Sequence, residues 1–380
     1  MIKIIPILKR SWHILWNYRI LWLFGILLVL TTGGNWNSNS SSSSSSQNTQ
    51  SSVSTWPPVL PENAPNGLRQ FIQWTVQVVH WFNQNVLPVV IHPLQHIGTI
   101  LLVVGLVLLI GLVIGALLSL VRYPAETAVM RMVDEYERSG SKLGFRQGWK
   151  LGWSRRAFRV WLIDLILALP VLVLVLLLLS AGLIVLASVS ETFQVTSAIG
   201  IVAAIGLAFI SLFLIVVVAV CLSLVRNFFV RFAALEGLDV RDSLSQSWPM
   251  FTRSWKSVGL MWLVMIGVGI AFGIVSLVLF FLFIPAYLVL LVPALLVAVL
   301  PGLAVFGITS IFISGPLAWI IGILGALPFF LITLFSPMIL VSGLYKIYAS
   351  NVWTLTYREI KAMQNHISVE LPAEQAQPAK

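Results

Sequence analysis

Long apolar runs recur along this chain, and several exceed 20 residues, such as those over 97–121 and 198–225. A helical run of that length matches the roughly 30 Å hydrocarbon core of a bilayer. With 58% hydrophobic and only 9% charged residues, too few polar side chains remain to cover a soluble fold of this length. We therefore predict an all-α integral membrane protein, with residues 1–380 forming a single membrane domain.

Basic residues give the chain a net charge of +10, and their distribution explains that excess. All of the 23 Lys and Arg residues except Arg69 lie in the two terminal segments or in the stretches 122–159 and 226–256. This alternation between connections follows the positive-inside rule. It predicts a multi-pass protein of the cell membrane with both termini cytoplasmic, and it removes the need for a nucleic-acid partner.

The apolar runs predict about six spans, with eight as the alternative. Basic residues on both sides of the apolar stretch 257–345 require an even number of crossings there. We predict two, with the Pro-containing surplus over 284–317 forming a broken hairpin buried in the bundle. The other predicted segments are spans over 14–30, 97–121, 158–187 and 198–225, and a cytoplasmic tail over 346–380.

The connection after the first span is polar and of low complexity, beginning "TTGGNWNSNSSSSSSSQNTQSS". Such a composition cannot bury a core, so 31–67 is predicted to be a solvated extracytoplasmic loop. Apolar and Gln-rich faces alternate at helical spacing over 68–95, with Trp74 and Trp81 alongside. This pattern predicts an amphipathic helix lying in the outer membrane interface.

A repeated unit is indicated by the tetrapeptide "SLVR", which ends apolar runs at 119–122 and at 223–226. The following stretches, "ERSGSKLGFRQGWKLGW" from Glu137 and "EGLDVRDSLSQSWPMF" from Glu236, align without gaps. A further match to their ends, "LKRSW", stands at 8–12. We predict that Trp12, Trp149, Trp248, Arg122 and Arg226 are interface anchors. The two recurring acids, Glu137 and Glu236, are predicted to cap or pair with the basic anchors.

The N-terminal Trp motif and the C-terminal stretch "SGLYKIYASNVWTLTYREI" are complementary halves of the same pattern. We hypothesise that they complete a third span-loop-span unit, which requires the first and last spans to be neighbours. In the second unit Pro249 directly follows Trp248, so we expect the helix to break there and Trp255 to serve as the second anchor.

The stretches "SWHILWNYRILWLFGILL", "ALEGLDVRDSLSQSW" and "TLTYREI" resemble bacterial polytopic proteins related to the glycerophosphodiester phosphodiesterase membrane domain. The resemblance covers most of the chain through short motifs. It implies a non-catalytic membrane module, without the soluble phosphodiesterase barrel that follows it in some relatives. It transfers no functional residue to this chain.

One carboxylate falls inside an apolar run, Asp164 in "RVWLIDLILALP". A carboxylate within a membrane is costly unless it is paired or protonated, so Asp164 is the candidate intramembrane functional residue, for proton coupling or substrate contact. The alternative is that water, Arg159 or a neighbouring helix satisfies it near the membrane edge. Acids on the basic loop, Asp134 and Glu135 among them, are expected to form salt bridges.

No phosphate-cradling loop, zinc-protease pair or nucleophile elbow occurs in the sequence, so we predict no catalytic, cofactor-binding or metal-binding residues. The scarcity of polar groups within the spans favours a non-enzymatic scaffold or partner module in the cell envelope. The alternative is a permease or lipid-handling transporter for a hydrophobic cargo. Expected partners are membrane lipids and either a membrane protein or a second copy of the chain.

Overall fold

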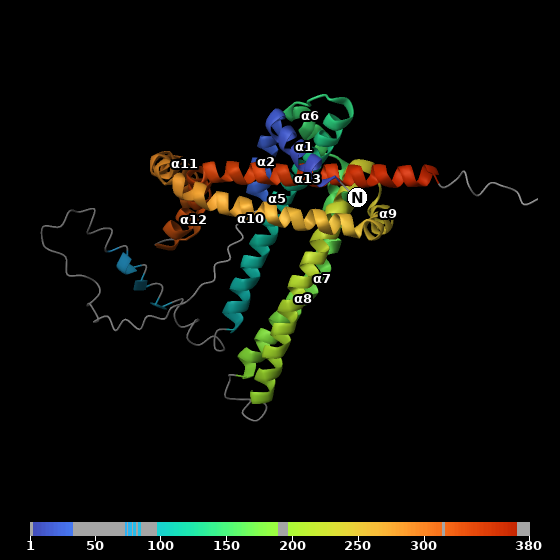
Figure 1. The fold of residues 1–380 in the computed structure, drawn as a ribbon. Helices are drawn as coiled ribbons and strands as arrows, with labels where there is room; N and C mark the ends of the chain where they lie inside the picture. Colours follow the sequence, from blue (N-terminus) through green and yellow to red (C-terminus); the bar gives the residue numbers. More distant parts are fainter. Residues whose placement is uncertain are drawn as a thin grey trace, which may run out of the picture. The chain divides into compact units, whose positions relative to one another are not determined.

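The computed structural model describes residues 3–32, 97–188, 197–313 and 316–370, together with scattered positions between 73 and 84. Every regular element in this described part is helical, which confirms the predicted all-α class (Figure 1). The helices are α1 (Ile4–Asn17), α2 (Ile20–Thr31), α5 (Ile97–Ser139), α6 (Phe145–Gly152), α7 (Arg155–Ser188), α8 (Ser197–Arg231), the π-helix η2 (Phe232–Glu236), α9 (Val240–Arg253), α10 (Trp255–Leu282), α11 (Ile284–Phe312), α12 (Pro316–Leu334) and α13 (Ser336–Glu370).

Six helices in the described residues are long and apolar enough to cross a membrane, in agreement with the predicted number. Their members differ from the prediction at two places. At the N-terminus, α1 and α2 are bent by 99° instead of forming one span over 14–30, and within 257–345 three candidates stand where two were predicted. The 12 residues of α2 extend only about 18 Å, short of a 30 Å core. The six candidates are Leu109–Ser139, Arg155–Ser180, Ile205–Glu236, Trp255–Leu282, Ile284–Phe312 and Leu317–Leu334.

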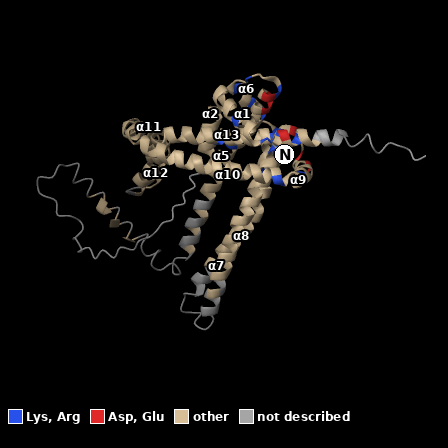
Figure 2. Ribbon diagram, in the orientation of Figure 1, with Lys and Arg blue, Asp and Glu red and all other residues tan. Residues whose placement is uncertain are grey.

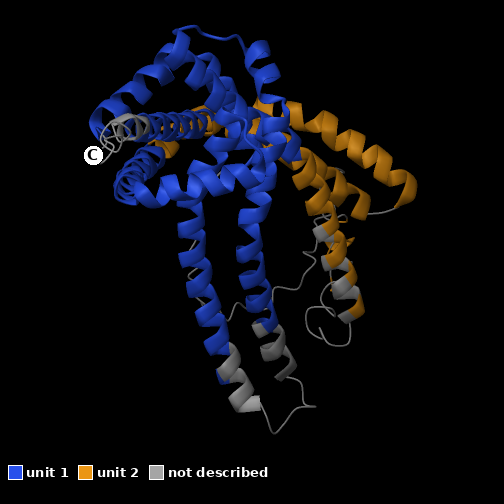
Figure 3. Ribbon diagram, turned by 90° about the vertical axis from the view of Figure 1, so that its right-hand side faces the viewer, with its two compact units in different colours: residues 1–34, 118–278, 340–380 blue, residues 35–117, 279–339 orange. Residues whose placement is uncertain are grey.

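The chain divides into two compact units, whereas the sequence analysis predicted a single membrane domain (Figure 3). Unit 1 comprises residues 1–34, 118–278 and 340–380, and unit 2 comprises 35–117 and 279–339. The N-terminal segment, the middle of the chain and the C-terminal segment therefore belong to the same unit. The predicted loop over 31–67 and most of the predicted interfacial helix over 68–95 lie outside the described residues.

Unit 1 has its packed core at one end, where Arg122, Arg226 and Lys346 lie; we call this the basic end. Charged side chains gather there, around α1, α6 and α9, while the α7–α8 hairpin carries none along most of its length (Figure 2). The core forms because α5, α8 and α13 continue past their apolar runs as helices. Its fully buried members include Val129, Met132, Phe228, Ala233, Ile347, Val352 and Ile360.

The second half of α13 belongs to this core, so part of the predicted cytoplasmic tail over 346–380 is helical and packed, while its position on the cytoplasmic side stays a prediction. Helix α13 runs unbroken to that residue and buries Val352, Tyr357 and Ile360. These side chains return at helical spacing and cover one face of the helix.

Each short helix at the basic end presents a small residue to the core, followed by a Trp that is exposed in α1 and α9 and partly buried in α6. The residue before the motif Trp is buried in all three helices: Ser11 in α1, Gly148 in α6 and Ser247 in α9. A Cβ on Gly148 would lie 2.3 Å from Met132 Sδ. The small residue of the motif therefore sets the close approach of these helices to the core.

The first and last helical segments of unit 1 are neighbours, as the three-unit hypothesis requires. A Cβ on Gly25 of α2 would lie 2.6 Å from the carbonyl oxygen of Gly343 in α13, and one on Gly343 would lie 3.0 Å from Ile26 N. Two glycines facing each other allow the two backbones to pack directly.

Helix α9 continues through Pro249 and ends at Arg253, so the predicted break after Trp248 is wrong. Proline removes one intrahelical hydrogen bond, and this short helix retains the others. The break follows at Ser254, and the next helix begins at Trp255, whose side chain is exposed.

Unit 2 contains α11 packed against α12. Their closest approaches involve Gly302, Gly322 and Gly325, and the rings of Phe306 and Trp319 stack with centroids 4.1 Å apart. Helix α11 runs continuously over 29 residues despite Pro293 and Pro301. The predicted broken hairpin over 284–317 is therefore replaced by one full-length helix and the start of a second.

Candidate functional site

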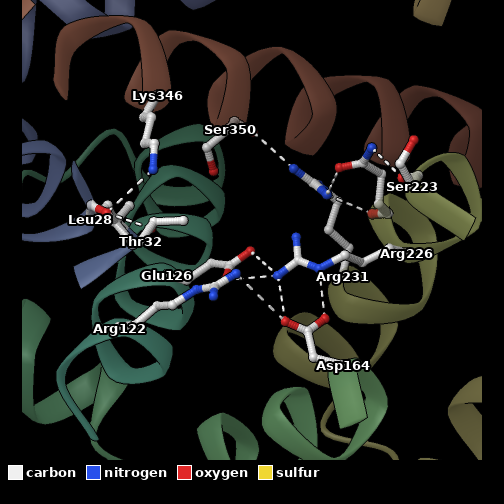
Figure 4. A network of polar contacts seen from close by, with 11 residues as sticks. Leu28, Thr32, Arg122, Glu126, Asp164, Ser223, Arg226, Arg231, Lys346 and Ser350 are labelled. Carbon is white, nitrogen blue, oxygen red and sulfur yellow. Dashed lines mark hydrogen bonds and ion pairs between the residues drawn. The ribbon is translucent and has the colours of Figure 1, made fainter. Parts of the chain in front are cut away.

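A network of charged side chains lies at the basic end of unit 1, between α5, α7, α8 and α13 (Figure 4). The sequence brings these groups together because α7 and α8 form an antiparallel hairpin, which places the start of α7 beside the end of α8. Asp164, near the start of α7, thereby contacts Arg226, the last residue of the second "SLVR", in α8.

Arg226 is the centre of the network. Its Nε donates to Asp164 Oδ1 at 2.6 Å, and its Nη2 donates to Asp164 Oδ2 at 2.8 Å. The same Nη2 lies 3.1 Å from both carboxylate oxygens of Glu126 in α5. Arg122 adds a longer contact, 3.9 Å from its Nη2 to Asp164 Oδ2. One guanidinium thus joins three helices through a two-pronged carboxylate contact and a second ion pair.

Asp164 is therefore satisfied by a neighbouring helix, one of the alternatives raised by the sequence. Arg159, another of those alternatives, pairs elsewhere: its Nη2 lies 2.6 Å from Asp239 Oδ1, and its Nη1 donates to the carbonyl oxygens of Gly237 and Leu238. Both carboxylate oxygens of Asp164 are thus bound by the guanidinium of Arg226.

Two further cations border the network without a carboxylate partner within 4 Å among the described residues. Arg231 of α8, 4% exposed, donates to the carbonyl oxygens of Asn227 and Ser350. Lys346 of α13 reaches the carbonyl oxygen of Leu28, with Nζ 3.4 Å away. Taken together, the network holds four cationic side chains against two carboxylates.

Several buried polar atoms of the network have no hydrogen-bond partner in the described part of the chain. Such groups are uncommon in folded proteins because each costs free energy when it is removed from water. They are Arg122 Nε, Arg231 Nε, Ser350 Oγ, and the amide nitrogen and oxygen of Asn351.

The recurring acids form a second set of contacts at the basic end. Glu137 accepts from Arg10 Nε at 2.8 Å, and Glu236 accepts from Lys361 Nζ and from the Tyr357 hydroxyl, the latter at 3.1 Å. Burial, followed by the charge of Glu236, raises the pKa of Tyr357 well above its usual value, so its hydroxyl stays protonated and donates. Both repeat acids thus bind a basic residue from a distant segment.

Asp134 of α5 binds two arginines. It lies 2.6 Å from Arg358 Nη1 of α13, and 3.0 Å from Arg138 Nε one turn along its own helix. The pairing with Arg138 confirms one predicted salt bridge, whereas Arg358 was not foreseen.

The predicted Trp anchors lie at the surface. Trp12 and Trp248 are more than half exposed and Trp149 is partly buried. Trp12 also lines an open groove of about 520 Å³ between α1 and α13, together with Leu8, Lys9, His13, Trp16 and Tyr348. The surface position of the three Trp residues suits a role at the membrane interface, which stays a prediction. Contact of Arg122 and Arg226 with lipid headgroups also stays a prediction; their side chains are about 30% exposed.

Sequence reasoning missed Glu126, Arg231, Lys346 and Ser350. Glu126 follows Arg122 by one helical turn, a spacing that places both on one face and was the available signal. Among the described residues, no group of three His, Cys, Asp or Glu side chains gathers as metal ligands would.

Comparison with protein families gives one match, to a family of unknown function (DUF7544), over residues 9–355. No curated protein and no solved structure matches the chain significantly. The predicted resemblance to glycerophosphodiester phosphodiesterase membrane domains is not tested by this match and stays a prediction.

Proposed function

Because the chain belongs to DUF7544, a family whose function is unknown, we propose a function from its own geometry: a non-enzymatic scaffold or partner module in the cell membrane. We further propose that both termini are cytoplasmic, which places the basic end at the inner surface, in keeping with the positive-inside pattern. Membrane lipids, and a membrane protein or a second copy of the chain, are the proposed partners.

The observation that carries this proposal is the separation of polar and apolar groups in unit 1. The charges at its spans pair with one another at the basic end, as the contacts of Arg226 with Asp164 and Glu126 illustrate. Only 6% of the most apolar stretch of either Arg155–Ser180 or Ile205–Glu236 is buried within the protein. Such a surface needs lipid or other helices to cover it, and it offers no row of polar groups for a solute.

The transporter alternative has less support. A proton-coupling carboxylate must exchange its proton, whereas Asp164 is engaged at both oxygens. The proline-containing segment of unit 2 is a continuous helix, α11, and lacks the unwound backbone with which many transporters bind their substrates.

Reconstitution combined with mass measurement tests the proposal. We expect liposomes containing the purified chain to pass or exchange a fluorescent phospholipid no faster than protein-free liposomes. Native mass spectrometry is expected to show a stable complex with lipids and either a second copy or a membrane partner. Exchange that depends on the protein and disappears in Asp164→Asn, but not in the exposed control Asp242→Asn, would overturn the scaffold proposal.

A further inference from the structure

The charge network at the basic end is not neutral. Asp164 and Glu126 supply two negative charges; both contact Arg226, and Arg122 lies close to Asp164. Among the described residues, Arg231 and Lys346 have only carbonyl oxygens as hydrogen-bond partners, which for Arg231 include the side-chain oxygen of Asn227. A guanidinium that is 4% exposed, with no described carboxylate within 4 Å, is unfavourable in a folded protein.

Unused hydrogen-bond donors accompany this surplus charge. Lys346 and Ser350 stand one turn apart on α13, and in Figure 4 both side chains point away from that helix, that of Lys346 toward Leu28. Ser350 Oγ is buried and has no partner in the described residues. The Nε atoms of Arg231 and Arg122, on two other helices, are likewise buried and have no hydrogen-bond partner in the described residues.

A phosphate group supplies both the missing negative charge and acceptors for the unused donors. It carries negative charge and several strong acceptor oxygens, and it binds guanidinium, ammonium and hydroxyl groups well. The nearby carboxylates do not forbid an anion, because Arg226 and Arg122 together balance the two negative charges of Glu126 and Asp164. The side chains of Arg122 and Arg226 remain about 30% exposed, so the network is open to its surroundings on one side.

We propose that Lys346, Ser350, Arg231 and Arg122 together bind a phosphate group, either that of an anionic phospholipid or free inorganic phosphate. The proposal holds whether the protein is a scaffold or a transporter. It explains why buried donors and surplus cations from three helices gather at one place.

Thermal unfolding of the delipidated full-length chain in detergent tests this site. Inorganic phosphate, phosphatidylglycerol and phosphatidylcholine are titrated separately, at an ionic strength fixed with chloride. A ligand that binds only the folded state raises the unfolding midpoint. We expect phosphate or phosphatidylglycerol to raise it with saturation. The probe that saturates identifies the source of the phosphate group.

Variants locate the binding. We expect Lys346→Gln to weaken the apparent Kd about tenfold and Ser350→Ala about threefold, since each removes one donor. Lys150→Gln, which removes the same charge from the exposed face of α6, is expected to bind as the unaltered chain does. Each variant's midpoint without ligand reports whether it is folded.

Three results would overturn the proposal. The first is a midpoint that rises no more with phosphate or phosphatidylglycerol than with chloride or phosphatidylcholine. The second is equal binding by Lys346→Gln and the unaltered chain. The third is an equal loss of binding in Lys150→Gln, which would indicate general attraction to a basic surface.

Discussion

Arg226 is the residue on which the basic end of unit 1 depends most. Its guanidinium binds Asp164 from α7 and Glu126 from α5, so its removal leaves two carboxylates without their partner. Removing one member of a buried ion pair costs more than the pair contributes, because the remaining charge keeps its desolvation penalty. The loss in free energy of unfolding caused by each variant should therefore increase with the number of charges that the variant leaves unpaired.

We expect Asp164→Asn to lower the free energy of unfolding by about 2–3 kcal/mol and Arg226→Gln to lower it by more. Denaturant unfolding in detergent measures both. Arg138→Gln, which breaks a pair whose arginine is 61% exposed, is the control and should cost less than about 1 kcal/mol. Equal losses in all three variants would contradict the central position of Arg226.

Tyr357 gives the basic end a predicted sensitivity to alkali. Its pKa is raised in the folded protein by burial and by Glu236, while in the unfolded chain it ionises near pH 10. The folded state then binds the proton more tightly, so this contribution to stability is complete below about pH 10 and decreases as the pH rises above it. Tyr357→Phe should show a smaller loss between about pH 9 and 11, measured by denaturant unfolding; an identical loss would contradict this assignment.

Among the elements, α2 and α13 make a close contact between segments far apart in the sequence. The contact rests on Gly25 and Gly343, where the nearest atoms to an added Cβ are backbone atoms, which cannot move aside. Gly25→Ala is expected to destabilise the protein by about 1–3 kcal/mol through overpacking. Gly267→Ala in α10, where no atom lies within 4 Å of the added Cβ, should be neutral or mildly stabilising. Thermal unfolding of both variants makes the comparison, and equal midpoints would argue against this crossing.

Sequence reasoning located the helices better than their partners. Apolar length revealed the spans of α7 and α8, and the recurrence of "SLVR" marked the ends of two runs. The packing of the second half of α13 into the core was not predicted, because the helix segments that cover its apolar face come from distant parts of the chain. The pairing of Arg226 with Asp164 joins residues 62 positions apart, and no local spacing encodes such a contact.

For the whole molecule, the crossing of unit 2 is the main question of topology. Helices α10, α11 and α12 are all candidates for spanning the membrane. If α10 leaves the side of the basic end and α11 returns to it, the residues that connect α11 and α12 should face the same side as the loop between α5 and α6. With Cys221→Ser as background, a membrane-impermeant maleimide should label Ile313→Cys and Ser141→Cys from the same side. Labelling of the two from opposite sides would indicate a re-entrant α11–α12 pair.

The contact of α2 with α13 can form only late in synthesis. Residues beyond 336 leave the ribosome after all the other helices of unit 1, and until then Gly25 has no Gly343 to pack against and Arg231 no Ser350 carbonyl to bind. The core can therefore be completed only after α13 has been synthesised, later than the other helices of unit 1. In a pulse–chase experiment, a chain stopped before residue 336 should be degraded well before the full-length protein; an equal lifetime would show that the core closes without its last helix.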